Sequence, residues 1–352
     1  SIAVMPFEAG NANGTENWLG IGIAEDLRNR LTMLDELVVS SRNLSFRDSI
    51  QGLDPQQVGR ELNTEYLLQG VVVRGPDNMI VNARLIDAVT GMQLWAESFS
   101  GEASALFDMQ QDIVAAVADS LKIDHAVQAT DAAERPEVLN IAAYDSYLRG
   151  RSQLREARDS DAAALAAAWF QQALSFDQQM PMARNGLCQA YVRELELSGS
   201  DWAYGKANQA CAEALLQGPE SIPAHLALAD FYRVTEHADN ALDEYRWVSG
   251  RDDSNADAWL GMGQVHWLQG DGAEAERAFR KALALNEDDA ETHALFTQFL
   301  LAEGRYAEAA EIARVLVQLD REPVEGYAYL AEALFMTGEF EAAIQASRQV
   351  LS

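Results

Sequence analysis

The residues of this 352-residue chain that could carry chemistry are five histidines, two cysteines and several acidic clusters. The sequence contains no phosphate loop of the Gly-x-x-x-x-Gly-Lys type, no His-Glu-x-x-His pair and no Gly-x-Ser-x-Gly elbow. Gly20-Ile21-Gly22 matches the start of a dinucleotide fingerprint, but the third glycine is absent. We therefore expect neither catalytic residues nor a cofactor, with an enzyme site in residues 1–123 as the alternative.

The histidines and cysteines are better explained by packing than by metal binding. His225 and His293 share one column of a repeating pattern, and His266 occupies a second aromatic position of that pattern. Such positions are spread along the chain, so these side chains could not share an ion and no metal site is expected. For Cys188 and Cys211 the favoured interpretation is two buried small hydrophobic side chains. The alternative is a disulfide, which would indicate an oxidising compartment.

The charge balance constrains the partner. Lys and Arg total 26 against 55 Asp and Glu, which gives a net charge of −29. Such a chain repels phosphate backbones, so nucleic acid is not an expected partner. The acidity either keeps an extended surface soluble or attracts a basic protein. The clusters 252–253 and 287–289 lack the central glycine of a calcium loop, so we interpret them as helix boundaries.

The ends of the chain suggest a fragment of a longer protein. Ser1 leads directly into a strand-like apolar run, and Ser352 stops within a helical pattern. No run approaches the ~18–20 apolar residues of a membrane helix, so this segment is not expected to insert into a membrane.

Residues 1–123 alternate between strand-like and helix-like patterns in the order βαβαβββα, which predicts an α/β domain with a mixed sheet. Pro55 fits the first position of a helix, where its missing N–H costs nothing. Residues 124–140 are polar and alanine-rich and are interpreted as a linker. Strands are expected at 2–7, 37–39, 66–74, 79–86 and 92–99, and helices at 16–34, from 55 and at 106–121.

From residue 141 onward the pattern is helical and repeats every ~34 residues, which predicts an all-α solenoid of tetratricopeptide helical hairpins over 141–352. Small residues recur where two helices of a hairpin touch, and glycines recur between them. We count about six hairpins, the last one truncated. The matching columns are His225, Trp259, His293 and Tyr327; Leu228, Met262, Phe296 and Leu330; Ala241, Ala275, Ala309 and Ala343; and Gly270, Gly304 and Gly338.

Residues 1–123 resemble the TolB amino-terminal-like domain through an ordered set of short motifs, and residues 143–151 resemble the first hairpin of the arrays that follow such domains. The resemblance implies the C-terminal part of a longer bacterial protein, with an upstream winged-helix or nucleotidyl-cyclase domain and a membrane anchor. It implies a non-catalytic sensing role, in the periplasm or alternatively in the cytoplasm. A constitutive scaffold for envelope proteins is the second hypothesis. The motifs lie at 2–7, 22–27, 59–62, 66–70, 85–91 and 94–97.

The first helix of each hairpin should line the concave face of the array, where a protein or peptide would bind. Trp267 is the residue on which we expect binding to depend most, because aromatic anchors dominate interface energetics. Its alternative role is packing on an adjacent helix. Self-association into a homodimer through exposed apolar surface is a further alternative. The predicted concave residues are Asp230, Arg233, Gln264, Trp267, Gln298, Leu301, Glu332, Phe335 and Met336.

Overall fold

The computed structural model describes residues 1–10, 17–34, 37–40, 45, 50, 52–75, 78–102, 105–123, 140–319 and 324–350. It divides into two compact units, Ser1–Ala227 and Leu228–Ser352. The predicted linker at 124–140 lies outside the described residues, apart from Asn140. Within the described part, no helix is both long and apolar enough to cross a bilayer.

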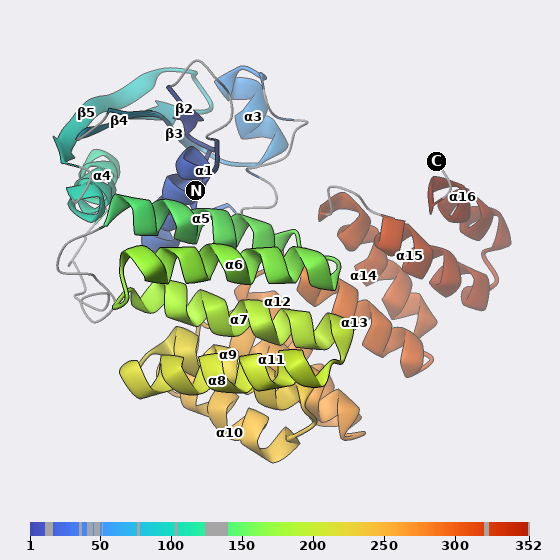
Figure 1. Cartoon of the computed structure of the whole chain (residues 1–352). Helices are drawn as coiled ribbons and strands as arrows, with labels where there is room; N and C mark the ends of the chain where they lie inside the picture. The colour runs from blue at the N-terminus through green and yellow to red at the C-terminus, as the bar shows by residue number, and fades with distance from the viewer. Residues whose placement is uncertain are drawn as a thin grey trace. The chain divides into compact units, whose positions relative to one another are not determined.

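In its described residues, the first unit begins with a small mixed sheet and three helices (Figure 1). The sheet order is β1-β3-β4-β5, and β2 also pairs with β3. β1 and β2 run parallel to β3, while β3, β4 and β5 are antiparallel neighbours. The elements are β1 (Ile2–Val4), β2 (Glu8–Ala9), α1 (Asn17–Thr32), α3 (Pro55–Glu61), β3 (Tyr66–Arg74), β4 (Asn78–Asp87), β5 (Gln93–Glu102) and α4 (Leu106–Leu121).

Two parts of the predicted element order differ from the structure. The strand expected at 37–39 is reduced to an isolated parallel bridge between Ile2 and Val39. Three apolar residues have the composition of a strand, but only one of them reaches a pairing partner. The strand predicted at 2–7 is shortened to β1, and a further short strand, β2, follows beyond the predicted range. Pro6 lies between the two strands and has no N–H to give to a sheet ladder.

The core of the α/β part lies between the sheet and α1 with α4. Side chains from alternate positions of β3 and β4 pack on Ile23, Leu27 and Ile113, all of them buried. α3 packs on the other face of the sheet, where Val58 and Leu62 contact a smaller cluster. Asp54 caps α3: its carboxylate accepts from the N–H of Gln57 at 2.8 Å. Pro55 then begins the helix, as the sequence predicts.

Twelve further helices follow in the described residues, and they form successive pairs (Figure 1). Glycines with φ of 78°, 71° and 86° at Gly270, Gly304 and Gly338 end three first helices, so the glycine column supplies left-handed turns that other residues rarely adopt. The pairs are α5 (Ile141–Arg155) with α6 (Ser160–Phe176), α7 (Pro181–Ser198) with α8 (Asp201–Gln217), α9 (Ile222–Val234) with α10 (Ala238–Ser249), α11 (Ala256–Leu268) with α12 (Gly272–Leu285), α13 (Ala290–Ala302) with α14 (Tyr306–Leu319), and α15 (Val324–Thr337) with α16 (Phe340–Val350).

The hydrophobic core of the α/β part extends without interruption into α5. Tyr144 and Leu148 of α5 are buried in the cluster that contains the sheet and α1. A Cβ on Gly22 of α1 would lie 2.6 Å from a Leu148 methyl carbon, so the two helices approach closely at this glycine. The α/β part and the hairpins α5–α8 are therefore one folding unit by their packing, joined through α1 and α5.

Candidate functional site: the inner face of the repeat array

The first helices of successive hairpins in the second unit contact one another, α11 with α13 and α13 with α15. In a solenoid the helices that approach across successive repeats lie on the inner side of the curve. Second helices pack on their own first helix through the alanine column, in which Ala241, Ala275 and Ala309 are fully buried. The first helices therefore present the candidate binding surface, the inner face.

Acidic residues form a column on this face that the sequence prediction missed. Asp257, Glu291 and Glu325 occupy the same place in the first turns of α11, α13 and α15, and all three are exposed. They are spaced by the repeat length, so the column could have been found from the sequence by reading one further offset.

Lysine and arginine are absent from the helices that carry this column, α11, α13 and α15. In this unit the lysine and arginine residues that lie on helices belong to the second helices α10, α12, α14 and α16, except for Arg233 of α9, and several of them form local ion pairs. Arg305, which precedes α14, contacts Glu276 at 2.7 Å and Glu308 at 2.6 Å. α11, α13 and α15 therefore each carry a net negative charge, whereas α9 carries both Asp230 and Arg233.

The carboxylates on this face influence one another. Solvent reaches Asp257, but the side chain is closely surrounded by protein, and the resulting loss of hydration raises its pKa to about 6, with further contributions from the charges of Asp289 and Asp230. Asp289 caps α13 by accepting from the N–H of Thr292 at 2.7 Å, which agrees with its predicted place at a helix start. A cationic side chain bound next to Asp257 would therefore offset the repulsion between these carboxylates and stabilise the charged form of Asp257.

The predicted residues at the start of the array are held in internal contacts. Asp230 is half-buried and accepts the hydroxyl hydrogen of Tyr245 over an O–O distance of 2.5 Å. Arg233 lies 3.8 Å from Asp230. Burial, followed by the charge of Asp230, raises the pKa of Tyr245 well above its usual range. Asp230 and Arg233 therefore brace the α9–α10 hairpin.

The predicted residues in the middle of the array are half-buried. Trp267 lies edge-on to Phe299 with ring centroids 6.0 Å apart, so it packs on an adjacent helix, as its alternative role proposed. Gln298 donates from Nε2 to the hydroxyl of Tyr329 at 2.6 Å, which joins α13 to α15. Leu301 packs against the hydrophobic core of the array. Gln264 is half-buried on the same helix as Trp267.

The predicted residues at the end of the array are the exposed ones. Phe335 is 60% exposed and Met336 is 49% exposed, and Glu332 is exposed on the same helix. The ring of Phe335 lies edge-on to Phe340 with centroids 5.5 Å apart. A shallow hollow of about 510 Å³ lies between α15 and α16, lined by Phe335, Glu332 and Phe340 among others.

The remaining sequence candidates have structural roles. His225 and His293 are buried, and one ring nitrogen of each lies at hydrogen-bond distance from a backbone carbonyl, that of Pro219 at 3.0 Å and that of Asp289 at 2.8 Å. Among the described residues, no group of three His, Cys, Asp or Glu side chains is placed to hold a metal ion.

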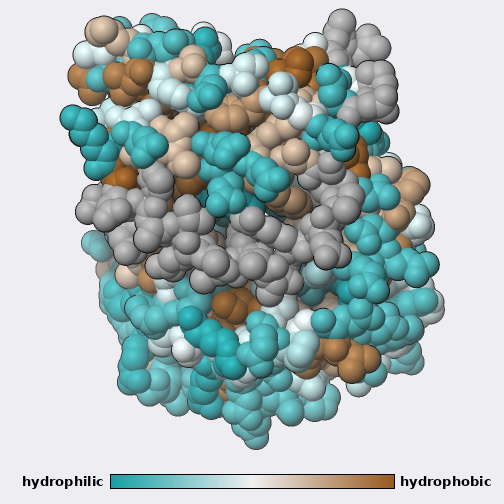
Figure 2. Space-filling model, turned by 90° about the vertical axis from the view of Figure 1, so that its left-hand side faces the viewer, coloured by the Kyte–Doolittle hydropathy of each residue, from teal (hydrophilic) through white to brown (hydrophobic). Residues whose placement is uncertain are grey.

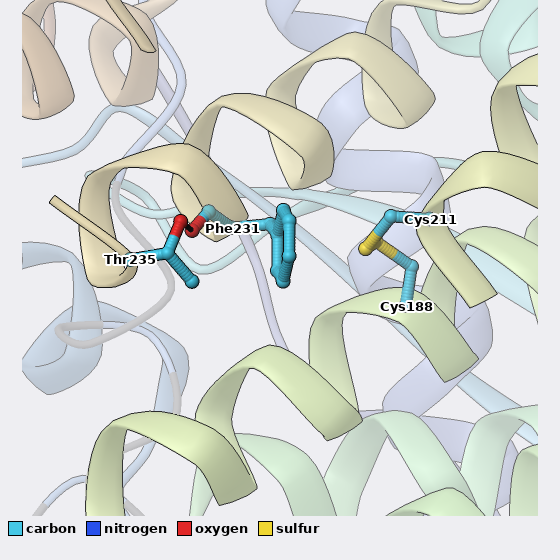
Figure 3. The surroundings of a disulfide bond; sticks show 4 residues. All are labelled: Cys188, Cys211, Phe231 and Thr235. Carbon is cyan, nitrogen blue, oxygen red and sulfur yellow. Dashed lines mark hydrogen bonds between the residues drawn. A yellow bond between two sulfur atoms is a disulfide. The ribbon is translucent and has the colours of Figure 1, made fainter. Parts of the chain in front are cut away.

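The favoured interpretation of the two cysteines is corrected by the structure. Cys188 of α7 and Cys211 of α8 form a disulfide that joins the two helices of one hairpin (Figure 3). Both side chains are fully buried. Their small size suits the close helix contact, which is why burial alone was a plausible interpretation, and the same closeness brings the two sulfur atoms together.

The comparison with protein families identifies the repeat. The model of the tetratricopeptide repeat matches residues 226–290 and 298–351. This part of the chain consists of tetratricopeptide repeats, as the sequence columns predict.

Two curated proteins show partial similarity. The putative adenylate cyclase 3 of Rhizobium meliloti (strain 1021) is 30% identical over 154 residues, covering 44% of this chain and 26% of that protein. The general transcriptional corepressor ssn6 of Schizosaccharomyces pombe (strain 972) is 35% identical over 78 residues, covering 22% and 7%. The chain thus spans about a quarter of the length of the first relative and less of the second.

Solved structures match the chain at low sequence identity. A thermophilic tetratricopeptide protein of Thermus thermophilus matches 55% of this chain and 100% of its own, with 19% identity and a TM-score of 0.48. The pilF protein of Pseudomonas aeruginosa matches 60% of this chain and 90% of its own, with 15% identity and a TM-score of 0.45.

Proposed function

We propose that this chain is a non-catalytic protein-interaction segment whose inner face binds a peptide or protein segment rich in basic side chains. The observation that carries the proposal is the acidic column of Asp257, Glu291 and Glu325 on helices that contain no lysine or arginine. Complementary charge accelerates encounter and selects partners, and the exposed apolar side chains of Phe335 and Met336 offer anchoring contacts at one end.

A charge-matched pair of variants tests the proposal. The triple variant Asp257→Asn, Glu291→Gln and Glu325→Gln removes the column. The control variant Asp243→Asn, Glu311→Gln and Glu341→Gln removes the same charge from exposed positions of second helices. Binding of a labelled lysine-containing peptide is measured by fluorescence anisotropy. We expect about tenfold weaker binding for the column variant and a change within about twofold for the control.

The peptide series also separates specific from general attraction. A peptide in which glutamate replaces lysine should not bind. Raising the salt concentration should weaken the binding of the lysine peptide to the parent protein. Equal weakening by both triple variants would show attraction by net charge alone and would refute an inner-face site. Unchanged binding in the column variant would refute it as well.

We further propose that the segment belongs to a membrane-anchored bacterial regulator and that residues 1–123 form a TolB amino-terminal-like domain. The partial similarity to a putative adenylate cyclase of much greater length supports this. The disulfide between Cys188 and Cys211 supports an extracytoplasmic, oxidising location. Cell fractionation with thiol labelling of the full-length protein tests both, because a cytoplasmic protein with two free thiols would contradict the proposal.

A constitutive scaffold is the second candidate, favoured by buried contacts that join the α/β part firmly to the first hairpin. Arg151 of α5 lies 2.8 Å from Asp26 of α1, and Arg155 lies 2.7 Å from Glu25. A scaffold would keep the same partners under all conditions, whereas a sensing segment would exchange them on a stimulus. Quantitative co-purification of the full-length protein under two growth conditions separates the candidates.

A further inference from the structure

As far as the structure describes the chain, the outer edge of β5 pairs with no other strand. In the described residues β5 pairs only with β4, and it extends over ten residues. Edge strands commonly carry proline, lysine or a covering element that prevents pairing with other chains. β5 contains no proline and no lysine. Its single irregularity is a register shift at its beginning, opposite Leu85 and Ile86, so the stretch from Trp95 onward is regular.

The ladder shows which residues of β5 direct their backbone groups outward. The N–H of Ala88 donates to the carbonyl of Glu65 at 2.7 Å, and that of Asp87 donates to the carbonyl of Met92 at 2.8 Å. Backbone groups alternate between the two edges of a strand. Even-numbered residues of β4 therefore face β3 and odd-numbered ones face β5. The register then directs outward the N–H and C=O groups of Ala96, Ser98 and Ser100.

These three residues are exposed, and their side chains are small. The register places them on the face of the sheet opposite to α1 and α4, in line with Arg84, Asn82 and Ile80. A hollow of about 930 Å³ lies on this face, and Ala96 and Ser98 are among its lining residues. An added strand would therefore find outward backbone groups beside it and space for alternate side chains.

The charge of the edge indicates the partner. β5 carries Glu97 and Glu102 and no basic residue. Figure 2 shows the molecule from the side on which β5 and α4 lie in Figure 1, with hydrophobic and hydrophilic residues interspersed in the upper part. A second copy of this chain paired along β5 would bring four carboxylates to one seam, which disfavours self-pairing. A basic segment would instead be attracted.

We propose that β5 binds an extended segment of a partner protein carrying basic side chains, which adds to the sheet as a further strand. The segment pairs with Ala96, Ser98 and Ser100 through backbone hydrogen bonds, and its basic side chains lie near Glu97. This surface belongs to the α/β part and is independent of the inner face of the repeats.

The probe is an extended peptide of alternating valine and lysine, as long as the regular part of β5, with a valine–glutamate peptide as its counterpart. Amide hydrogen exchange is measured residue by residue. We expect the lysine peptide to protect the amides of Ala96, Ser98 and Ser100. The substitution Ser98→Pro removes one outward donor and should weaken binding about tenfold, whereas Ser98→Ala keeps that donor and should stay within about twofold.

A charge exchange keeps the test valid if the proline variant fails to fold. Glu97→Lys should shift the preference from the lysine peptide toward the glutamate peptide. Protection confined to other amides, or no preference between the two peptides, would overturn the proposal. Protection of the same three amides that depends on protein concentration without peptide would identify a second copy as the occupant and would overturn it too.

Discussion

The guanidinium of Arg151 on α5 lies 2.8 Å from the carboxylate of Asp26 on α1 and 3.1 Å from that of Glu25. The hydroxyl of Tyr144, also on α5, donates to Asp26 at an O–O distance of 2.5 Å. Although burial works against the charge, Asp26 and its neighbours raise the pKa of Arg151 well above its usual range. Two helices more than a hundred residues apart in sequence thus share one largely buried charge cluster.

Removing one partner of this cluster should destabilise the first unit. Asp26→Asn leaves Arg151 poorly compensated in a largely buried place, and we expect a loss of about 3 kcal/mol in the free energy of unfolding. Urea unfolding followed by tryptophan fluorescence measures it. The exposed Glu61→Gln is the control and should change stability by less than about 0.5 kcal/mol. A similar small effect for Asp26→Asn would show that the cluster is not holding α1 to α5.

Loss of the disulfide should also destabilise the first unit. Cys188 and Cys211 are 23 residues apart, and the chain-entropy model gives about 3 kcal/mol for a loop of that size. The double variant Cys188→Ala, Cys211→Ala should unfold at lower urea than the parent. A reductant should bring the parent to the stability of the variant and leave the variant unchanged. A parent insensitive to reductant would contradict this expectation.

The repeat unit should be sensitive to pH through Asp257. Because its folded-state pKa is raised to about 6, the folded state holds a proton that the unfolded chain releases near about pH 4. The protonated carboxyl of Asp257 therefore contributes fully to the free energy of unfolding below about pH 4, and this contribution is lost as the pH rises through about 6. Asp257→Asn should therefore stabilise the unit at pH 7 and not at pH 4. Its exposure to solvent limits the effect to less than about 1 kcal/mol. Thermal unfolding at both pH values measures it, and equal shifts would contradict the assignment.

A glycine in α11 should tolerate no larger side chain. A Cβ on Gly261 would lie 2.1 Å from the ring of Tyr245, the residue that binds Asp230. Gly261→Ala should force the ring from its place and cost about 2 kcal/mol. Gly205 in α8 has no atom within 4 Å of such a Cβ, so Gly205→Ala should stabilise the protein by about 0.5 kcal/mol. Urea unfolding measures the change in the free energy of unfolding for each variant. Changes of the same sign in the two variants would refute the packing argument.

The repeat was predictable because its period is local. Glycine, alanine and aromatic positions at one spacing specify the hairpins without any knowledge of distant contacts, and the turn glycines have the backbone conformation that this requires. The same spacing contains the acidic column of Asp257, Glu291 and Glu325, which a search for aromatic anchors overlooks. Trp267, the residue on which binding is predicted to depend most, is half-buried and its ring packs on Phe299.

What the sequence could not supply were relationships between distant segments. The pairing of Val39 with Ile2 depends on one register among many, and so does the meeting of Asp26 with Arg151. The disulfide was the less favoured alternative because composition does not give the distance between two sulfur atoms. Each of these depends on how helices and strands approach one another, which no local pattern encodes.

The acidic column of the inner face also determines how far apart the basic residues of a bound segment should lie. Packed helices lie about 10 Å apart, and an extended chain advances about 3.3 Å per residue. Successive carboxylates of Asp257, Glu291 and Glu325 would then match every third residue of a bound segment. A ligand with lysine or arginine in that rhythm would satisfy all three positions at once, whereas the same number of charges placed consecutively would reach only one. The order of charges in the partner, and not merely their number, should decide which segments bind.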